Sequence, residues 1–196
     1  KELIDNGKIG KLQYIYSNRL NLGQIRKEEN VFWSLAPHDI SILQYFIDSY
    51  PIDISCSGGA FVQEKIHDTT LTVLSYENNI KAHIYVSWLH PFKEHRLVVI
   101  GSDGMLRFED SSTNKELIYY DKGYSVIEGS LEKKDGQIEV IKYEKKMPLK
   151  EELKYFINNI DAKEIKKSGA KDGFEIVKIL ESANNSLNKV EYSNYE

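Results

Sequence analysis

The sequence contains a single cysteine, Cys56, among its 196 residues. An intrachain disulfide is therefore impossible, and a reducing compartment, the cytoplasm, is the expected location. No apolar run approaches the roughly 18 residues that a membrane-spanning helix needs, and no stretch has the pattern of a signal peptide. We therefore expect no membrane partner.

An excess of positive charge is also missing. The formal net charge is −4 and the isoelectric point is near 5.8. Because nucleic-acid partners favour a basic surface, we expect no nucleic-acid partner. An anionic small ligand remains possible, since a few local arginine or lysine side chains can bind one.

The familiar cofactor and metal motifs are absent as well. There is no G-x-G-x-x-G after a strand, no phosphate-binding P-loop, no nucleophile elbow and no H-E-x-x-H or paired-cysteine signature. A metal site made from His83, His90 and His95 would need a strand and a loop to converge, so no metal is expected. This chain alone is not expected to bind a dinucleotide.

What the sequence does contain is many short strands bounded by turns. Ile80–Trp88 is the clearest, because its apolar residues alternate with polar ones. Turns at Ser102-Asp103-Gly104 and Asp121-Lys122-Gly123 indicate hairpins, and Leu131–Gly136 suggests a charged loop. The other predicted strands are Lys11–Leu22, Ile52–Val62, Asp68–Tyr76, His95–Gly101, Met105–Glu109, Leu117–Tyr120, Tyr124–Glu128 and Ile138–Tyr143.

Three segments have the apolar spacing of helices: Asn30–Ser49, Leu149–Ile160 and Asp172–Asn188. Tight turns between strands imply antiparallel pairing, and helices before and after a run of strands imply an α+β fold. We therefore predict a large, open, mainly antiparallel β-sheet with helices on one face. The other face would carry apolar side chains, with Ile84, Val86 and Trp88 as candidates. A homo-oligomer, dimer or tetramer, through that face is the expectation.

The densest set of chemically useful residues lies between Arg19 and Asp39. A strand end carries Arg19 into a loop, and the loop leads to the start of a helix that bears His38. Arginines at such a junction suit a carboxylate or phosphate, and a histidine in the first turn of a helix suits proton transfer. The candidate substrate-binding residues are Arg19, Asn21, Arg26, Asn30, Trp33, Ser34, Asp39 and Trp88.

Plainer interpretations remain open for each of these residues. From spacing alone, surface charges are the simpler interpretation of Arg19 and Arg26, and a structural histidine that of His38. Trp88 could stack on a sugar ring or lie in the core or at an interface. Asp39 follows His38 directly, so it points to another face of the helix.

Three stretches of the chain also occur in a recognisable order. The first is Gly7-Lys8-Ile9-Gly10-Lys11 before a strand, and the second is Asn30–Ser41 around His38. The third runs from Ser87 to Gly104 and is followed by the closing segment Asp172–Ala183. Together they resemble the C-terminal half of the Gfo/Idh/MocA family of oxidoreductases, and in particular its nucleotide-sugar dehydrogenase branch.

The resemblance implies a Rossmann domain N-terminal to residue 1 that binds NAD or NADP and supplies a catalytic lysine. Residues 1–10 would then be the tail of a linker helix, and residues 11–196 the substrate-binding and oligomerisation domain. His38 matches the family histidine beside the reacting sugar carbon. Ser34 stands where many members have an aspartate one helical turn earlier, so a His/Asp proton-transfer pair is not expected.

The resemblance further implies hydride transfer between nicotinamide and a hydroxyl carbon of a sugar or nucleotide sugar. The intact two-domain chain would be the active enzyme, and these residues alone would be inactive. The alternative is a non-catalytic sugar-binding or oligomerisation module that functions without a cofactor domain. The absence of an initiating methionine and the short first helix favour the enzyme.

Overall fold

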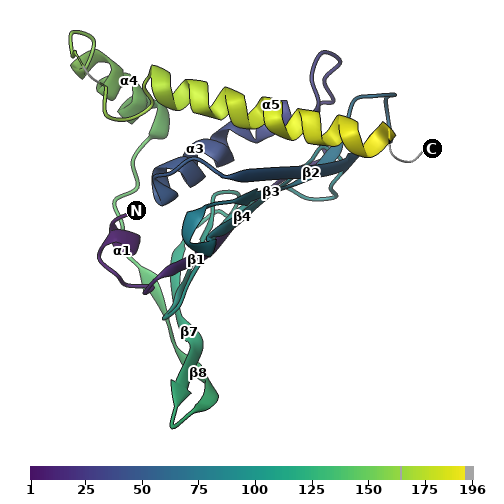
Figure 1. The fold of residues 1–196 in the computed structure, drawn as a ribbon. Helices are drawn as coiled ribbons and strands as arrows, with labels where there is room; N and C mark the ends of the chain where they lie inside the picture. Colours follow the sequence, from purple (N-terminus) through teal and green to yellow (C-terminus); the bar gives the residue numbers. More distant parts are fainter. Residues whose placement is uncertain (164, 193–196) are drawn as a thin grey trace.

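The computed structural model describes residues 1–163 and 165–192, with side chains as far as residue 188. These residues form an eight-stranded sheet with its main helices on one side (Figure 1). In chain order, the elements are α1 (Glu2–Asp5), β1 (Leu12–Leu20), α2 (Val31–Leu35), α3 (Pro37–Ile47), β2 (Asp53–Gly59), β3 (Thr69–Ser75), the 3-10 turn η1 (Glu77–Asn79), β4 (Lys81–Ser87), β5 (Glu94–Gly101), β6 (Met105–Glu109), β7 (Leu117–Ile127), β8 (Ser130–Ile141), α4 (Pro148–Asn158) and α5 (Ala170–Tyr192).

The strand order is β2-β3-β4-β1-β5-β6-β7-β8. Neighbours pair in antiparallel fashion except β1 and β4, which run parallel with Ser17 beside Ile84. A parallel pair needs a long crossover, and here it contains α2, α3, β2 and β3. The predicted α+β class with an open, mainly antiparallel sheet is confirmed.

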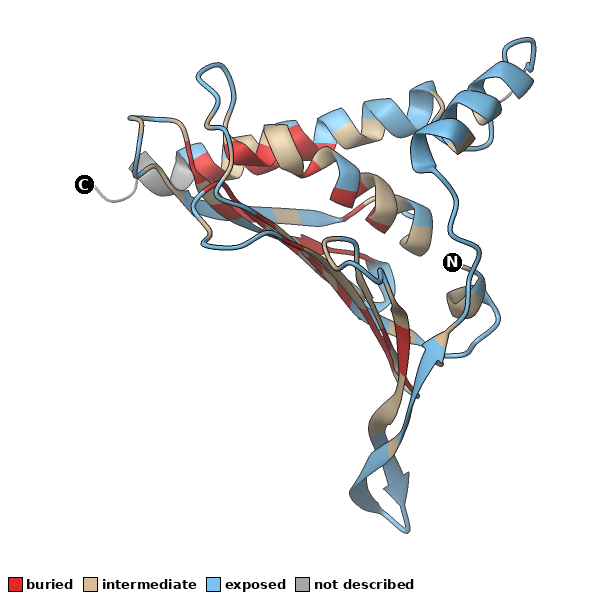
Figure 2. Cartoon of the chain, turned by 180° about the vertical axis from the view of Figure 1, so that it is seen from behind, coloured by how far each residue is buried: buried red, intermediate tan, exposed pale blue. Residues whose placement is uncertain are grey.

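Helices α3 and α5 cover one face of the sheet, and the core lies beneath them (Figures 1 and 2). Ile40 and Leu43 of α3 and Ile179 of α5 are completely buried there. Ile84 and Val86 of β4 are also completely buried, and Trp88 is 2% exposed. The prediction that Ile84, Val86 and Trp88 lie on the face without helices is therefore wrong. Strand alternation shows which residues share a face but not which face the helices cover.

The opposite face of the sheet, which we call the open face, is not covered by any helix of the described residues (Figures 1 and 2). The rings of Tyr14, Tyr16 and His83 stack there, with 5.2 Å between the centroids of Tyr16 and His83. Leu71 and Val73 of β3 are 43% and 39% exposed on the same face. This face therefore presents a mixture of aromatic and aliphatic side chains.

The helix predicted over Asn30–Ser49 is two consecutive helices, α2 and α3. Asn30 caps the first, because its side-chain oxygen accepts the backbone N–H of Trp33 at 3.1 Å. Pro37 begins the second, where its missing N–H costs nothing. Asp48 ends it in the left-handed conformation, with φ 58°.

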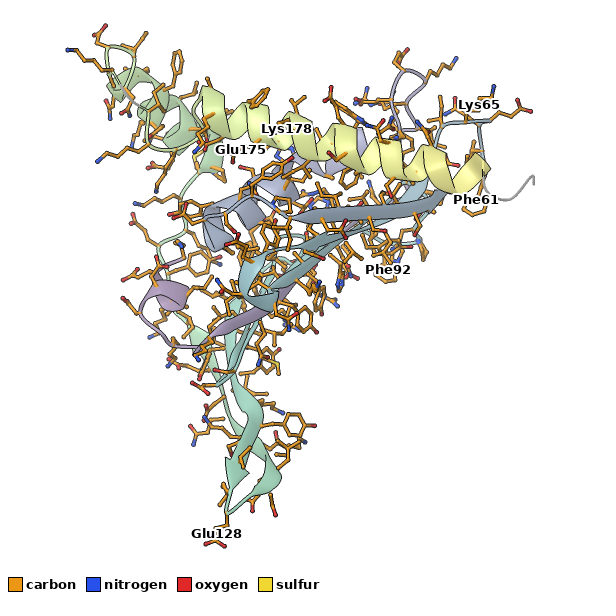
Figure 3. All side chains as sticks on the ribbon, in the orientation of Figure 1. Phe61, Lys65, Phe92, Glu128, Glu175 and Lys178 are labelled. Carbon is orange, nitrogen blue, oxygen red and sulfur yellow. The ribbon has the colours of Figure 1, made fainter. Side chains whose placement is uncertain are left out.

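The predicted hairpin turn at Asp121-Lys122-Gly123 is wrong, since β7 continues through it, with a shift in its pairing to β8 between Tyr120 and Lys122. The turn instead lies at Glu128 and Gly129, where both φ values are positive (50° and 83°), as a type I′ turn requires (Figure 3). Gly123 allows a close approach, because a Cβ there would lie 2.9 Å from the carbonyl oxygen of Ser102. The predicted loop Leu131–Gly136 is part of β8.

Helix α4 has the predicted amphipathic pattern, but its apolar side is not covered by any part of the chain that the structure describes. We call this side the α4 stripe, and each of its residues is more than half exposed (Figure 2). The stripe consists of Leu149, Leu153, Phe156 and Ile157 of α4 and Ile160, which follows the helix. Among the described residues, no helix is both long enough and apolar enough to cross a membrane.

Candidate active site

Four of the predicted site residues, Arg19, Asn21, Asp39 and Trp88, lie near the point where the parallel strands β1 and β4 end. The backbone N–H of Asn21 donates to the carbonyl of Ser87 at 3.1 Å, and that of Gly23 donates to the carbonyl of Trp88 at 3.2 Å. The loop after β1 is thereby attached to the end of β4 and leads into α2 and α3. The ends of β1 and β4 and the start of α3 therefore lie together, with His38 beside them.

His38 lies in the first turn of α3 and is exposed to solvent. Its backbone belongs to a regular helix that packs on the sheet through Ile40 and Leu43, both completely buried. The side chain is thus presented on a rigid element and is free to contact a second surface. This combination suits a group that accepts or gives a proton at a substrate hydroxyl.

Asp39 points the other way, into the protein, as the helical spacing predicts. It is 3% exposed. The Nε of Arg19 donates to Oδ2 of Asp39 at 2.7 Å, and Nη2 donates to Oδ1 at 3.2 Å. The hydroxyl of Ser17 donates to the same Oδ1. The carboxylate is therefore fully engaged with β1, which argues against the substrate contact expected for Asp39.

Arg19 is partly buried and is held on a second side by His95. Its Nη1 lies 3.5 Å from Nδ1 of His95. Burial lowers the pKa of His95, and the positive charge of Arg19 lowers it further, so the neutral ring accepts this contact. These contacts use three of the five N–H donors of Arg19 and hold the guanidinium toward Asp39 and His95.

The other predicted residues divide into structural and accessible ones. The Nδ2 of Asn30 donates to Oδ1 of Asn184 in α5 at 2.9 Å, so both ends of that side chain are used structurally. Trp88 is 2% exposed in the core, and this burial leaves no ring face for a sugar. Asn21 and Arg26 are exposed, while Trp33 and Ser34 are half-buried. The accessible members are therefore His38, Asn21, Arg26 and, in part, Trp33 and Ser34.

Sequence reasoning missed two members of the buried network, Ser17 and His95. Ser17 precedes Arg19 by two residues, so strand alternation alone places both on the same face of β1. His95 faces Arg19 across the β1–β5 pair. That pairing is non-local and has no signature in the sequence.

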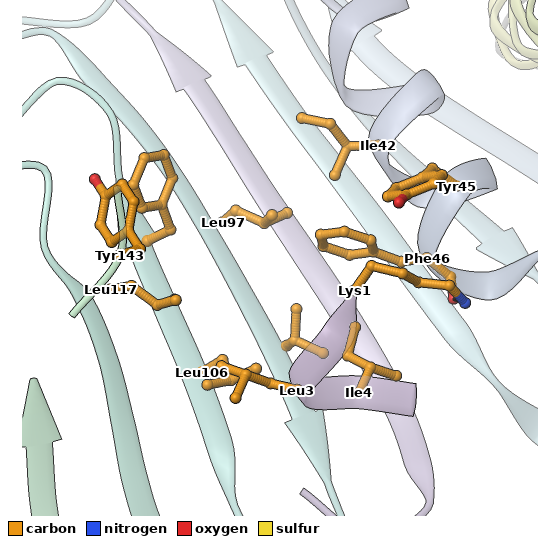
Figure 4. A pocket seen from close by; sticks show the side chains of 12 residues that line it. Lys1, Leu3, Ile4, Ile42, Tyr45, Phe46, Leu97, Leu106, Leu117 and Tyr143 are labelled. Carbon is orange, nitrogen blue, oxygen red and sulfur yellow. Dashed lines mark hydrogen bonds between the residues drawn. The ribbon is translucent and has the colours of Figure 1, made fainter. Parts of the chain in front are cut away.

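An apolar groove lies on the helix side, away from these residues. It has a volume of about 390 Å³ between α1, the end of α3 and strands β5–β7 (Figure 4). Leu3, Phe46, Leu97 and Tyr143 are among its lining residues, whereas His38 is not. Within the described part of the chain, no three His, Cys, Asp or Glu side chains are grouped so that they could hold a metal ion.

Comparison with known proteins gives a consistent picture. A family model described as the GFO/IDH/MocA C-terminal domain matches residues 1–107, which is more than half of the chain. No curated protein matches the sequence.

Several solved structures share the fold. UDP-N-acetylglucosamine 3-dehydrogenase GnnA from Acidithiobacillus ferrooxidans is 17% identical, with a TM-score of 0.77 over 95% of this chain and 57% of that one. A protein from Desulfitobacterium hafniense described as an NADPH-dependent oxidoreductase is 17% identical (TM-score 0.76, 96% and 58%). Aldose-aldose oxidoreductase from Caulobacter crescentus is 11% identical (TM-score 0.77, 96% and 57%). This chain thus spans less than two thirds of the length of each.

Proposed function

This chain belongs to the GFO/IDH/MocA family of oxidoreductases, and we propose that it is the substrate-side domain of an enzyme that oxidises or reduces a sugar or nucleotide sugar. The reaction would be hydride transfer between a hydroxyl-bearing carbon and a nicotinamide cofactor, NAD or NADP. The observation that carries this proposal is the placement of His38. It is exposed in the first turn of α3, next to the C-terminal ends of β1 and β4.

His38 would manage the proton of the reacting hydroxyl. During oxidation, the imidazole accepts this proton while the hydride leaves the same carbon, and during reduction it returns the proton. Ser34 lies in α2, the helix that precedes α3, and is half-buried. Its hydroxyl could hydrogen-bond a neighbouring hydroxyl of the substrate. Arg26 is exposed on the loop after β1 and would bind an anionic part of the substrate, such as a phosphate.

The cofactor does not fit the residues present here. The described residues contain no glycine-rich turn between a strand and a helix that could hold a pyrophosphate. We therefore propose that the cofactor binds mainly to an N-terminal nucleotide-binding domain, which supplies the hydride acceptor or donor. The length of the matched structures supports this division, since the matched parts make up only 57–58% of them.

Two apolar surfaces offer a docking site for that domain. One is the groove between α1 and strands β5–β7, and the other is the α4 stripe. Both lie on the helix side of the sheet, where α4 extends away from the rest of the fold (Figure 1). Large exposed apolar patches mark protein contacts.

The open face is proposed to bind a second copy of this chain. Eight strands about 4.8 Å apart give a face roughly 34 Å wide, and strands of about eight residues on average give a length of about 27 Å. The resulting area of roughly 900 Å² per copy is comparable to the ~800 Å² per partner of a standard interface. A homodimer, or a tetramer built from it, is therefore a physically reasonable assembly.

Substitution of His38 in the complete polypeptide tests the proposed function. His38→Ala is expected to lower kcat by about 100-fold or more, because general acid–base groups contribute at least that much, and to change KM little. Steady-state kinetics with candidate nucleotide sugars and both nicotinamide cofactors give the measurement. Glu132→Ala, an exposed residue of β8, is the control and is expected to match the unaltered enzyme. Equal kcat values for the two variants would refute the role of His38.

A further inference from the structure

We propose that Arg19, Asp39 and Ser17 form a buried clamp that fixes the rotation of α3 and thereby the position of His38. Arg19 and Asp39 would then be positioning residues, although the sequence suggested that both contact the substrate. The role assigned to His38 rests on the proposed function, but the clamp is a feature of this chain that can be tested separately.

The start of α3 lacks the usual side-chain cap. Its N-cap residue, Ala36, makes no side-chain hydrogen bond, and Pro37 at the first position has no N–H to satisfy. Asp39 occupies the third helical position, from which an acidic side chain often folds back onto its own helix. Here it reaches instead to the neighbouring strand. The first turn is therefore held by its contact with β1.

The clamp is anchored at a rigid part of the sheet. β1 is an interior strand, paired with β4 on one side and β5 on the other. Ser17 and Arg19 lie two residues apart on the face of β1 that α3 covers, and all three hydrogen bonds to the Asp39 carboxylate come from these two side chains. Motion of the first turn of α3 would break charge-assisted bonds in a site that water barely reaches.

The geometry fixes an orientation as well as a distance. Nε and Nη2 of Arg19 bind different oxygens of Asp39, which sets the plane of the carboxylate. Successive residues of an α-helix are rotated by about 100°, so an Asp39 directed at the sheet places His38 on the adjoining, exposed side. A rotation of α3 about its axis would displace the imidazole of His38 and break the clamp at the same time. The two side chains are mechanically coupled because they are neighbours.

His95 completes the arrangement from β5. Its Nδ1 faces Nη1 of Arg19 at 3.5 Å, and the charged groups around the ring are Arg19, Lys93, Asp110 and Asp39. A neutral His95 limits the rotation of the guanidinium without competing for Asp39. The clamp therefore spans α3, β1 and β5.

The test compares conservative variants in the complete polypeptide that contains this domain. Arg19→Lys keeps the charge but loses the fork, Asp39→Asn keeps the shape but loses the charge, and Ser17→Ala removes one hydrogen bond. Because a displacement of about 1 Å can cost on the order of 100-fold in rate, we expect the first two variants to lower kcat by roughly 10-fold to 100-fold. KM is expected to stay within about threefold. Ser17→Ala is expected to have a smaller effect of the same kind.

A second readout does not depend on turnover. The imidazole signal of His38, assigned in histidine-labelled protein by comparison with His38→Ala, is expected to shift and broaden in Arg19→Lys and Asp39→Asn. Circular dichroism and thermal unfolding check that each variant is folded, and Ser17→Ala decides the matter if the other two do not fold.

Two results would overturn the clamp. One is an unchanged His38 signal together with unchanged kcat in the folded variants. The other is a large rise in KM at constant kcat for Arg19→Lys, which would make Arg19 a substrate ligand. A shifted His38 signal in the Arg19 and Asp39 variants, combined with normal turnover of His38→Ala, would keep the clamp and reject the proposed function.

Discussion

The two halves of the sheet, β2-β3-β4-β1 and β5-β6-β7-β8, differ in what covers them. Helices α3 and α5 pack on the first half, and Ile15, Ile40 and Ile84 are completely buried there. In the second half, the β7–β8 hairpin extends beyond the rest of the fold, and Val126 and Leu131 are 72% and 71% exposed (Figures 1 and 2). The core of the first half is formed by residues of this chain. The second half and α4 present apolar side chains whose proposed partners are another domain or another copy of the chain.

The largest expected effect is on the free energy of unfolding, when a buried isoleucine of the covered half is compared with an exposed isoleucine of the α4 stripe. Ile84→Ala is expected to lower the free energy of unfolding by about 2–5 kcal/mol, because it leaves a cavity in a completely buried site. Ile157→Ala, in the α4 stripe and 65% exposed, is expected to cost less than about 0.5 kcal/mol. Urea unfolding of the 196-residue chain gives both values. Similar losses would mean that the α4 stripe packs against this domain after all.

A charge on the open face is expected to weaken self-association. Leu71→Glu would bury an unpaired carboxylate in the proposed interface, which costs several kcal/mol. We expect the dissociation constant of the dimer to rise by at least about 100-fold, equivalent to about 2.7 kcal/mol. Sedimentation velocity over a range of concentrations measures it. Val177→Glu, an exposed position on α5, is the matched control, and equal weakening by both variants would place the interface elsewhere.

The smallest expected effect concerns the place where the two halves of the sheet meet, at the β1–β5 pair, where His95 of β5 contacts Arg19. Burial, followed by the charge of Arg19, lowers the pKa of His95 in the folded state. Below the ordinary histidine value of 6.5, the unfolded chain therefore binds more protons, and stability falls as the pH falls from there through the folded pKa. His95→Gln is expected to make the slope of unfolding free energy against pH shallower below about pH 6.5. An unchanged slope would show that His95 is not linked to folding.

The sequence predicted local structure better than it predicted which surfaces meet. The alternation in Ile80–Trp88 correctly indicated a strand, because alternation is set by residues next to one another. It could not show that Ile84 and Trp88 face the helices, which depends on the packing of α5, a distant segment. The hairpin turn was misplaced because Asp121-Lys122-Gly123 has turn-like composition, while the bond pattern of β7 and β8 selects Glu128-Gly129.

The candidate site shows the same division. Helical spacing was enough to direct Asp39 away from His38. The partner of Asp39 was not predictable, because a strand arginine and a helix aspartate twenty positions later meet only once the crossover has formed. The sequence analysis therefore listed Arg19 as a substrate-binding residue, whereas in the structure its guanidinium binds the carboxylate of Asp39.

The position of β1 in the sheet has a consequence for the order of folding. β1 precedes every other strand of this chain, yet both of its neighbours, β4 and β5, follow α2, α3, β2 and β3. During synthesis, the adjacent strands β2, β3 and β4 can pair as a meander soon after they emerge, whereas β1 must wait with its apolar residues uncovered. Arg19 can meet His95 of β5 only when β5 pairs with β1, so the candidate site is completed when the centre of the sheet closes.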